Sequence, residues 1–168
     1  VAKKCTQDVL ILESDLIFEQ RALACFNDFF ERSIVLTTPY QNVGDEVYVT
    51  QSQKDSLMGM TKNKPDNLEQ ATVLAGITRC SVPCLQAMCT YYKQQNTPHV
   101  DYEDALVAVA KDKQVITICV PDMQIMEIDD AEHVEKAKTI LARIKAHDRS
   151  CHVEQKYLLN PGPATTTD

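Results

Sequence analysis

The spacing of hydrophobic residues predicts four strands. Residues 34–38 and 115–120 are rich in β-branched side chains and each run is followed by a proline, which is typical of buried strands. Residues 46–50 alternate between apolar and polar side chains and follow a turn signal, and residues 123–128 predict a further short strand. Because residues 115–120 are almost continuously apolar, we expect them to form a central strand that is buried on both faces.

Capping residues and a period of 3.6 residues predict three helices in the second half. Ser81, with a proline in the turn that follows, predicts a helix that reaches Gln95. Asp101 is followed by two further carboxylates, which are favourable at the positive end of a helix. After Asp129 or Asp130, apolar residues recur at three- and four-residue spacing, which predicts a long amphipathic helix.

The first half of the chain is compatible with more than one assignment of helices and strands. Leucine and phenylalanine spacing predicts a helix over residues 14–32, and residues 6–13 are either its beginning or a strand over residues 8–12. Residues 51–65 are polar and contain glycine and proline, so we expect an irregular loop there. Residues 67–80 predict another helix, capped by Asp66 or Asn67.

Alternating strands and helices are the pattern of an α/β layered fold. We expect a single α/β domain over residues 1–152, with a mixed or mostly parallel sheet of about 4–5 strands flanked by about 5 helices. Residues 153–168 are expected to be a flexible tail or linker. Within them, Asn160-Pro161-Gly162-Pro163 resembles the end of the ribosome-skipping peptides of viral polyproteins, and we interpret it as a linker.

Charge and hydropathy restrict the classes of partner. The net charge is −7, which opposes nonspecific binding to nucleic acid. No run approaches the roughly 20 apolar residues that span a bilayer. The chain begins at Val1, which suggests a domain excised from a larger protein, so the expected partners are another protein or other domains of the same polypeptide.

Cysteines indicate the compartment. Seven are present, an odd number, and most lie in apolar segments, which predicts reduced thiols in the cytoplasm. The spacing of Cys80, Cys84 and Cys89 differs from the two-residue spacing of zinc knuckles. We therefore predict neither a metal site nor a cofactor.

One cysteine is also a candidate nucleophile. Cys84 follows Ser81 in the first turn of a predicted helix, where the backbone lowers the pKa of a thiol. His99 or His152 would then act as the base. The alternative is a structural cysteine in the core.

A ligand site is also expected where strands end. In open α/β sheets, ligands bind beyond the carboxyl ends of the strands. If two of the predicted strands are parallel, their ends lie at one edge and form a crevice for a small polar ligand. The residues expected to line it are Thr37, Thr38, Asn42, Gly44 and Asp122.

The motif search favours a protein without catalytic activity. The glycine-rich nucleotide loops and the zinc-protease motif are absent from the sequence. Our first hypothesis is a noncatalytic protein-interaction or regulatory module from a larger intracellular or viral protein. It would bind its partner through a sheet edge or through a helix face, with Leu141 and Ile144 of the last helix as the expected interface residues. The alternative is a small-molecule or nucleotide-binding α/β domain that works at the strand-end crevice, with or without enzymatic activity.

Overall fold

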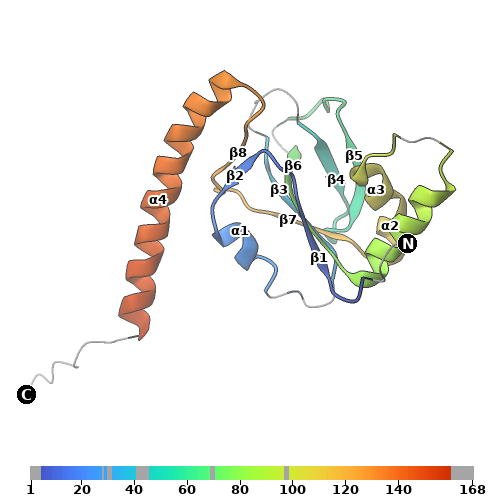
Figure 1. The fold of residues 1–168 in the computed structure, drawn as a ribbon, viewed down its shortest axis with the longest axis horizontal. Coiled ribbons are helices and arrows are strands. Elements are labelled where there is room, and N and C mark those ends of the chain that lie inside the picture. The colour runs from blue at the N-terminus through green and yellow to red at the C-terminus, as the bar shows by residue number, and fades with distance from the viewer. Residues whose placement is uncertain are drawn as a thin grey trace, which may run out of the picture. The chain divides into compact units, whose positions relative to one another are not determined.

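A computed structural model describes residues 5–27, 29, 32–40, 46–68, 71–96 and 99–159, with side chains up to residue 147 (Figure 1). The described residues form two compact units, which we call the sheet unit (residues 5–14 and 21–123) and the ribbon unit (residues 15–20 and 124–159). The elements in chain order are β1 (Val9–Leu12), β2 (Leu16–Phe18), α1 (Arg21–Ala24), β3 (Ile34–Pro39), β4 (Tyr48–Gln51), β5 (Leu57–Thr61), β6 (Thr72–Cys80), α2 (Val82–Gln94), α3 (Tyr102–Lys113), β7 (Ile116–Cys119), β8 (Ile125–Glu127) and α4 (Ala131–Leu159).

The sheet unit contains a mixed sheet, which confirms the predicted α/β class. Its strand order is β5-β4-β6-β3-β7, with β1 also paired to β6. β3 and β7 are parallel, and the other pairs are antiparallel. In Figure 1, α2 and α3 lie on one side of the strands and α1 on the other. The ribbon unit consists of the antiparallel pair β2–β8 and the helix α4.

β6 corrects the helix predicted over residues 67–80. It pairs with β3 along one edge, while β4 and β1 share its other edge. Between those two partners lies Gly76, whose φ of 63° suits glycine and whose carbonyl accepts a hydrogen bond from the Glu13 N–H at 3.0 Å. Pairing on both edges outweighs the local helical spacing. The loop predicted over residues 51–65 is also wrong, because β5 pairs there with β4.

The helix predicted over residues 14–32 is wrong as well. Leu16–Phe18 is a strand, and among the described residues of this segment only Arg21–Ala24 is helical. The apolar residues on the expected helical face belong to separate elements, so their spacing was misleading. The alternative strand over residues 8–12 is correct, since Val9–Leu12 forms β1.

The helix starts in the second half are confirmed. Ser81 is the N-cap of α2, with proline in its first turn, and Asp101 is the N-cap of α3. The α4 helix follows Asp130, whose Oδ1 accepts a hydrogen bond from the His133 N–H at 2.8 Å. The strands at β3, β4, β7 and β8 are also confirmed within a few residues.

The predicted central position of β7 is wrong. β7 is the last strand in the order and pairs only with β3 as a strand. Thr117 is buried, whereas Cys119 at its carboxyl end is exposed. The Leu57 N–H donates to the Val115 carbonyl at 2.9 Å, and the Thr117 N–H donates to the Asp55 backbone carbonyl at 2.7 Å. The β4–β5 turn therefore covers the outer edge of β7, which explains its apolar sequence.

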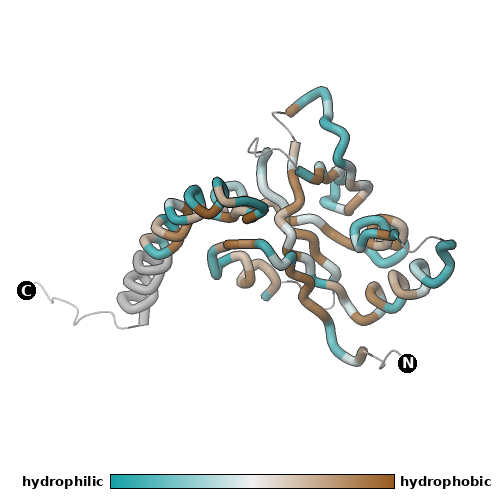
Figure 2. The backbone as a smooth tube through the Cα atoms, turned by 45° about the horizontal axis from the view of Figure 1, so that its top comes forward, coloured by the Kyte–Doolittle hydropathy of each residue, from teal (hydrophilic) through white to brown (hydrophobic). Residues whose placement is uncertain are grey.

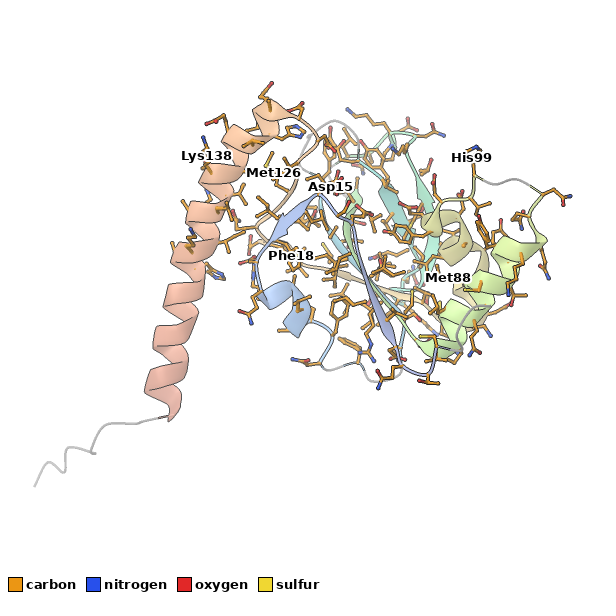
Figure 3. All side chains as sticks on the ribbon, viewed as in Figure 1. Asp15, Phe18, Met88, His99, Met126 and Lys138 are labelled. Atoms are coloured by element: carbon orange, nitrogen blue, oxygen red, sulfur yellow. The ribbon has the colours of Figure 1, made fainter. Side chains whose placement is uncertain are left out.

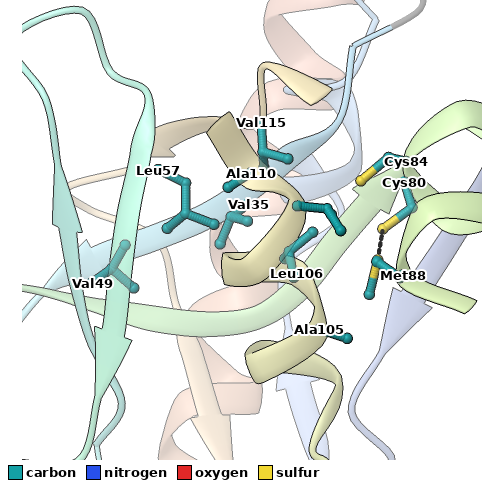
Figure 4. Close-up of a cluster of buried hydrophobic side chains, with 11 residues drawn as sticks. Val35, Val49, Leu57, Cys80, Cys84, Met88, Ala105, Leu106, Ala110 and Val115 are labelled. Atoms are coloured by element: carbon teal, nitrogen blue, oxygen red, sulfur yellow. Dashed lines mark hydrogen bonds between the residues drawn. The ribbon is translucent and has the colours of Figure 1, made fainter. Parts of the chain in front are cut away.

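The main core lies between the sheet and the helices α2 and α3. Val35, Val115 and Leu106 are each fully buried there, and Figure 4 shows their side chains converging beneath α3. Figure 2 shows that hydrophobic residues are concentrated in the strands of the sheet unit, whereas hydrophobic and hydrophilic residues are mixed in the coloured part of α4. The core is therefore built mainly by β-strands and the inner faces of two helices.

Several predictions fall at or beyond the limits of the described residues. Asn42, Gly44 and the Asn160-Pro161-Gly162-Pro163 segment lie outside them. The predicted domain limit after residue 152 falls inside α4, and the division into domains stays a prediction.

No helix within the described part is long and apolar enough to cross a membrane. The six cysteines whose side chains are described form no disulfide, while cytoplasmic localisation stays a prediction.

Candidate functional site

Cys84 lies in the first turn of α2, as predicted, but its side chain is fully buried beside Cys80. A hydrogen bond with the Cys80 thiol lowers the pKa of Cys84 to about 7, although burial opposes the shift. The same contact, together with burial, raises the pKa of Cys80. Cys80 also contacts Met88, with 3.8 Å between the two sulfur atoms.

This environment supports a structural role for Cys84. The other groups that lower the pKa of Cys84 are Ser33 and Lys113, and neither is a histidine base. His99 is exposed, and the side chain of His152 lies outside the described residues. Because the Cys84 side chain is 0% exposed, a substrate cannot reach its sulfur in this structure. A catalytic role for Cys84 stays a prediction without a supporting contact.

The strand ends proposed as a crevice do lie at one edge. β3 and β7 are parallel, with Thr37 opposite Cys119, and the Val120 N–H donates to the Thr37 carbonyl at 2.9 Å. However, the side chains of Thr37 and Thr38 are buried within the sheet. Of the predicted ligand-binding residues that the structure describes, only Asp122 is exposed.

A group of acidic residues surrounds the start of α3. The Tyr102 hydroxyl donates to Glu13 Oε1 at 2.7 Å, and this site is partly buried. Burial raises the pKa of Glu103, and the nearby charges of Glu13 and Asp101 raise it further. Tyr102 also has a raised pKa, chiefly because of burial. Burial and the neighbouring carboxylates disfavour the charged form of Glu103, so its ionisation opposes folding.

Glu103→Gln is therefore expected to raise the melting temperature at pH 7. Because the folded pKa of Glu103 lies above the unfolded value, its stabilising contribution is present below the unfolded pKa and is lost as the pH rises through the folded pKa. The gain from Glu103→Gln should shrink as the pH falls toward 4. Thermal denaturation at both pH values tests this, with Asp112→Asn, an exposed aspartate at the other end of α3, as control. An equal gain at both pH values would contradict the role assigned to charge.

A different group of carboxylates lies at one end of the β2–β8 ribbon. The Ile128 N–H donates to the Asp15 carbonyl at 2.9 Å, so Asp15 lies across from the end of β8. Asp129 and Asp130 follow directly in the chain, and all three aspartates are exposed. Figure 3 shows Asp15 at the opposite end of β2 from Phe18. The strand pairing thus places aspartates from two distant parts of the sequence at the same end of the ribbon.

The start of α4 sets the electrostatics of this group, which we call the ribbon-end aspartates (Asp15, Asp129 and Asp130). The N–H of His133 lowers the pKa of Asp130, and the nearby His133 side chain adds to this shift. Asp129 Oδ2 lies 3.5 Å from the His133 Nδ1 atom. The arrangement presents carboxylate oxygens to solvent, and such oxygens are the ligands that hard cations prefer.

The described residues hold no preformed cluster of three or more histidine, cysteine or acidic side chains around a metal position. Mg²⁺ does not require one, because it is usually bound by one or two carboxylates together with water and substrate phosphates. The ribbon-end aspartates therefore suit a cation that arrives with a phosphorylated ligand better than a permanent metal.

Asp15 was not among the predicted site residues, because the helix predicted over residues 14–32 included it. Asp129 and Asp130 were interpreted only as helix caps, and the Asp130 hydrogen bond to His133 confirms that part. A usable signal was the strand alternative for residues 8–12. It would have ended the first strand just before Asp15 and left Leu16–Phe18 as a separate apolar run.

The apolar face of α4 has a structural explanation. α4 packs on β2 and β8 of the ribbon unit. Ile144, one of the two residues predicted to bind a partner, is buried, while Leu141 remains 37% exposed. The helical spacing was therefore correct, but burial of Ile144 removes it from any exposed binding face.

The fold resembles that of nucleotidyltransferases. The inositol-1-phosphate CTP transferase from T. maritima matches 84% of this chain, with a TM-score of 0.63 and 12% sequence identity. A protein from Bacillus anthracis, assigned as a glucose-1-phosphate thymidylyltransferase and solved in complex with a sucrose, matches 82% with a TM-score of 0.60 and 12% identity. The match covers 57% and 55% of those two chains, so this chain spans little more than half their length. It matches no protein-family model.

These similarities correct our first functional hypothesis. Both proteins are described as enzymes that transfer a nucleotidyl group, which contradicts the noncatalytic interaction or regulatory module. They likewise give no support to a viral origin. The absence of glycine-rich nucleotide loops from this chain favoured the noncatalytic hypothesis, and that interpretation was misleading. The alternative hypothesis, a nucleotide-binding α/β domain, is favoured instead.

Proposed function

We propose that this chain takes part in nucleotidyl transfer and binds a nucleoside triphosphate, with its Mg²⁺, at the ribbon-end aspartates. The observation that carries the proposal is the 2.9 Å hydrogen bond from Ile128 to Asp15, which brings Asp15 to the two aspartates before α4. The likeness in fold to two nucleotidyltransferases supports the same class of substrate.

Charge explains why a cation is part of the substrate. The chain has a net charge of −7, and the ribbon-end aspartates would repel a bare triphosphate. Asp15 and Asp129 would hold a Mg²⁺ ion, whose positive charge would offset this repulsion. Asp15 and Asp129 would then position the nucleotide through the cation, while Asp130 also caps α4.

The proposed reaction follows the chemistry that the two similar proteins share in their names. Both use a sugar or inositol 1-phosphate as acceptor. A phosphate oxygen of the acceptor forms a bond to the α-phosphorus of the triphosphate, the bond from that phosphorus to the bridging oxygen breaks, and pyrophosphate leaves. We therefore expect a phosphate monoester as the second substrate.

Asp15→Asn is expected to weaken binding of Mg²⁺–nucleoside triphosphate by at least about tenfold, because a neutral amide is a poorer ligand for Mg²⁺ than a carboxylate. Isothermal titration calorimetry of the 168-residue chain with CTP and with dTTP, with and without Mg²⁺, measures this. Asp112→Asn is the matched control, since Asp112 is an exposed aspartate of α3.

The same titrations separate the two candidate sites. If the strand-end crevice binds the nucleotide, Asp122→Asn weakens binding and Asp15→Asn does not. Equal affinity of the Asp15→Asn and Asp112→Asn proteins would disprove the ribbon-end site. Binding that persists unchanged in EDTA would disprove the role of the cation.

A further inference from the structure

Three sulfur-containing side chains lie together where β6 ends and α2 begins. Cys80 is the last residue of β6, Cys84 lies in the first turn of α2, and Met88 follows about one turn later. The four-residue spacing places Cys84 and Met88 on one face of the helix, and Figure 4 shows both beside Cys80. Cys89, the other cysteine of this helix, is exposed instead. The structure thus groups two cysteines with a methionine that the cysteine spacing alone did not indicate.

The sulfur atoms of this group, which we call the sulfur cluster (Cys80, Cys84 and Met88), contact one another. The Cys80 thiol donates a hydrogen bond to the Met88 sulfur, with 3.8 Å between the two atoms. A hydrogen bond also joins the Cys80 and Cys84 thiols. At a metal–sulfur distance of about 2.3 Å, two ligands of one ion lie roughly 3.8–4.0 Å apart. The separation of Cys80 and Met88 therefore suits two ligands of a shared metal ion.

The surroundings of the sulfur cluster are apolar and dry. Cys80 and Cys84 are each 0% exposed, and Met88 is 6% exposed. All three belong to the main core, in the same cluster as Leu106 and Val109 of α3. A hard cation such as Mg²⁺ needs oxygen ligands and keeps part of its water shell, so it does not fit here. Thiolate and thioether sulfur are instead the ligands that soft ions prefer.

The number of ligands distinguishes between the soft ions. A structural zinc ion is almost always bound by four ligands, and the sulfur cluster offers fewer. No group of three or more histidine, cysteine or acidic side chains supplies a zinc site elsewhere in the described part of the chain. Cu(I) is stable with fewer ligands than zinc and binds thioether as well as thiolate sulfur. Two thiolates and one thioether therefore match Cu(I).

We propose that the sulfur cluster is a binding site for Cu(I). The ion enters when the first turn of α2 opens locally, and the three sulfur atoms then enclose it. Each of the two thiols loses a proton as its sulfur binds the ion, and the complex is left with a single negative charge. The nearby positive charge of Lys113 offsets that charge. The proposal does not depend on nucleotide binding at the ribbon-end aspartates.

The protonation of the two thiols favours binding near neutral pH. The pKa of Cys84 is lowered to about 7, so a large share of this thiol is already deprotonated there. The pKa of Cys80 is raised by its hydrogen bond to Cys84 and by burial, so Cu(I) has to displace that proton. Binding should therefore tighten as the pH rises, with release of protons to the buffer.

Anaerobic titration of the 168-residue chain with Cu(I), in competition with a coloured Cu(I) chelator, tests the proposal. The chelator removes Cu(I) that is held only weakly by exposed thiols, so the wild-type chain should retain a single ion. Cys80→Ser and Cys84→Ser should each weaken binding by at least about a hundredfold, because a hydroxyl is a poor ligand for a soft ion. Met88→Leu should weaken it by about tenfold, since one of the ligands is lost.

Cys89→Ser is the matched control, because Cys89 lies on the same helix and is exposed, and its affinity for Cu(I) should be unchanged. Equal affinity of the Cys84→Ser and Cys89→Ser proteins would overturn the proposal, as would a wild-type chain that loses all Cu(I) to the chelator. X-ray absorption at the copper edge of the wild-type complex needs no variant. It should show sulfur ligands alone, and nitrogen or oxygen ligands would also overturn the proposal. Nucleotide titrations of the same proteins report separately on the proposed function.

Discussion

Replacing Leu106 with alanine is expected to lower the free energy of unfolding of the sheet unit by about 2–5 kcal/mol. Leu106 lies on α3 and is fully buried, in the same core cluster as Val35, Val115 and Cys84. The substitution removes apolar contacts and leaves a cavity that the packed sheet cannot fill by moving. This helix therefore depends on Leu106 for its position over the sheet.

Urea denaturation followed by circular dichroism measures this effect. Met58→Ala is the matched control, because Met58 is 66% exposed on β5 and its truncation should change the stability by less than about 0.5 kcal/mol. A loss for Leu106→Ala as small as that of the control would show that α3 does not pack as described.

Glu19→Ala is expected to destabilise the ribbon unit by about 2–4 kcal/mol. The Glu19 side chain is fully buried, and its Oε1 accepts a hydrogen bond from the Gln124 N–H at 2.8 Å. Its Oε2 lies 2.9 Å from the His147 Nδ1 atom. The carboxylate thus connects β2, the segment before β8 and α4. Removing it costs less than breaking a wholly buried ion pair, because the His147 side chain is 43% exposed and partly screened by water.

Hydrogen exchange of individual amides is the suitable measurement, since two compact units need not unfold together. The amides of Gln124 and Ile144 should exchange faster in Glu19→Ala, while that of Leu106 in the sheet unit should be unchanged. His133→Ala is the control, because His133 contacts the exposed Asp129 rather than a buried group. Unchanged exchange at Gln124 would contradict the role assigned to Glu19.

Helix starts were predictable because their signals are local. Ser81, Asp101 and Asp130 each lie directly before the helix that they begin. The hydrogen bond from the His133 N–H to Asp130 joins residues only three positions apart. A capping interaction of this kind is complete within one turn, so the sequence near it contains all the necessary information.

β6 was not predictable in the same way. Its residues include alanine, leucine and isoleucine at spacings that also suit a helix. The choice was decided by β3, β4 and β1, which pair with it from distant parts of the chain. The same holds for Leu16–Phe18, which is a strand because β8 lies beside it.

Only part of the functional chemistry could be anticipated. The carboxyl ends of β3 and β7 were expected to lie at one edge of the sheet, and they do. However, the Thr37 side chain is buried there and is not exposed to a ligand. The position of Cys84 in a first turn was expected, but its complete burial depends on the helices and strands around it. Asp15 was missed because its relation to Asp129 exists only through strand pairing.

By itself the sequence determined the α/β class, the starts of α2, α3 and α4, and the strands β3, β4, β7 and β8, because caps, prolines and β-branched runs act within a few residues. Only the tertiary structure decided that β6 is a strand, that β1 pairs with it and that Asp15 lies at the same end of the ribbon as Asp129 and Asp130. These features depend on hydrogen bonds between residues far apart in the chain, and local residue patterns carry no information about such pairings.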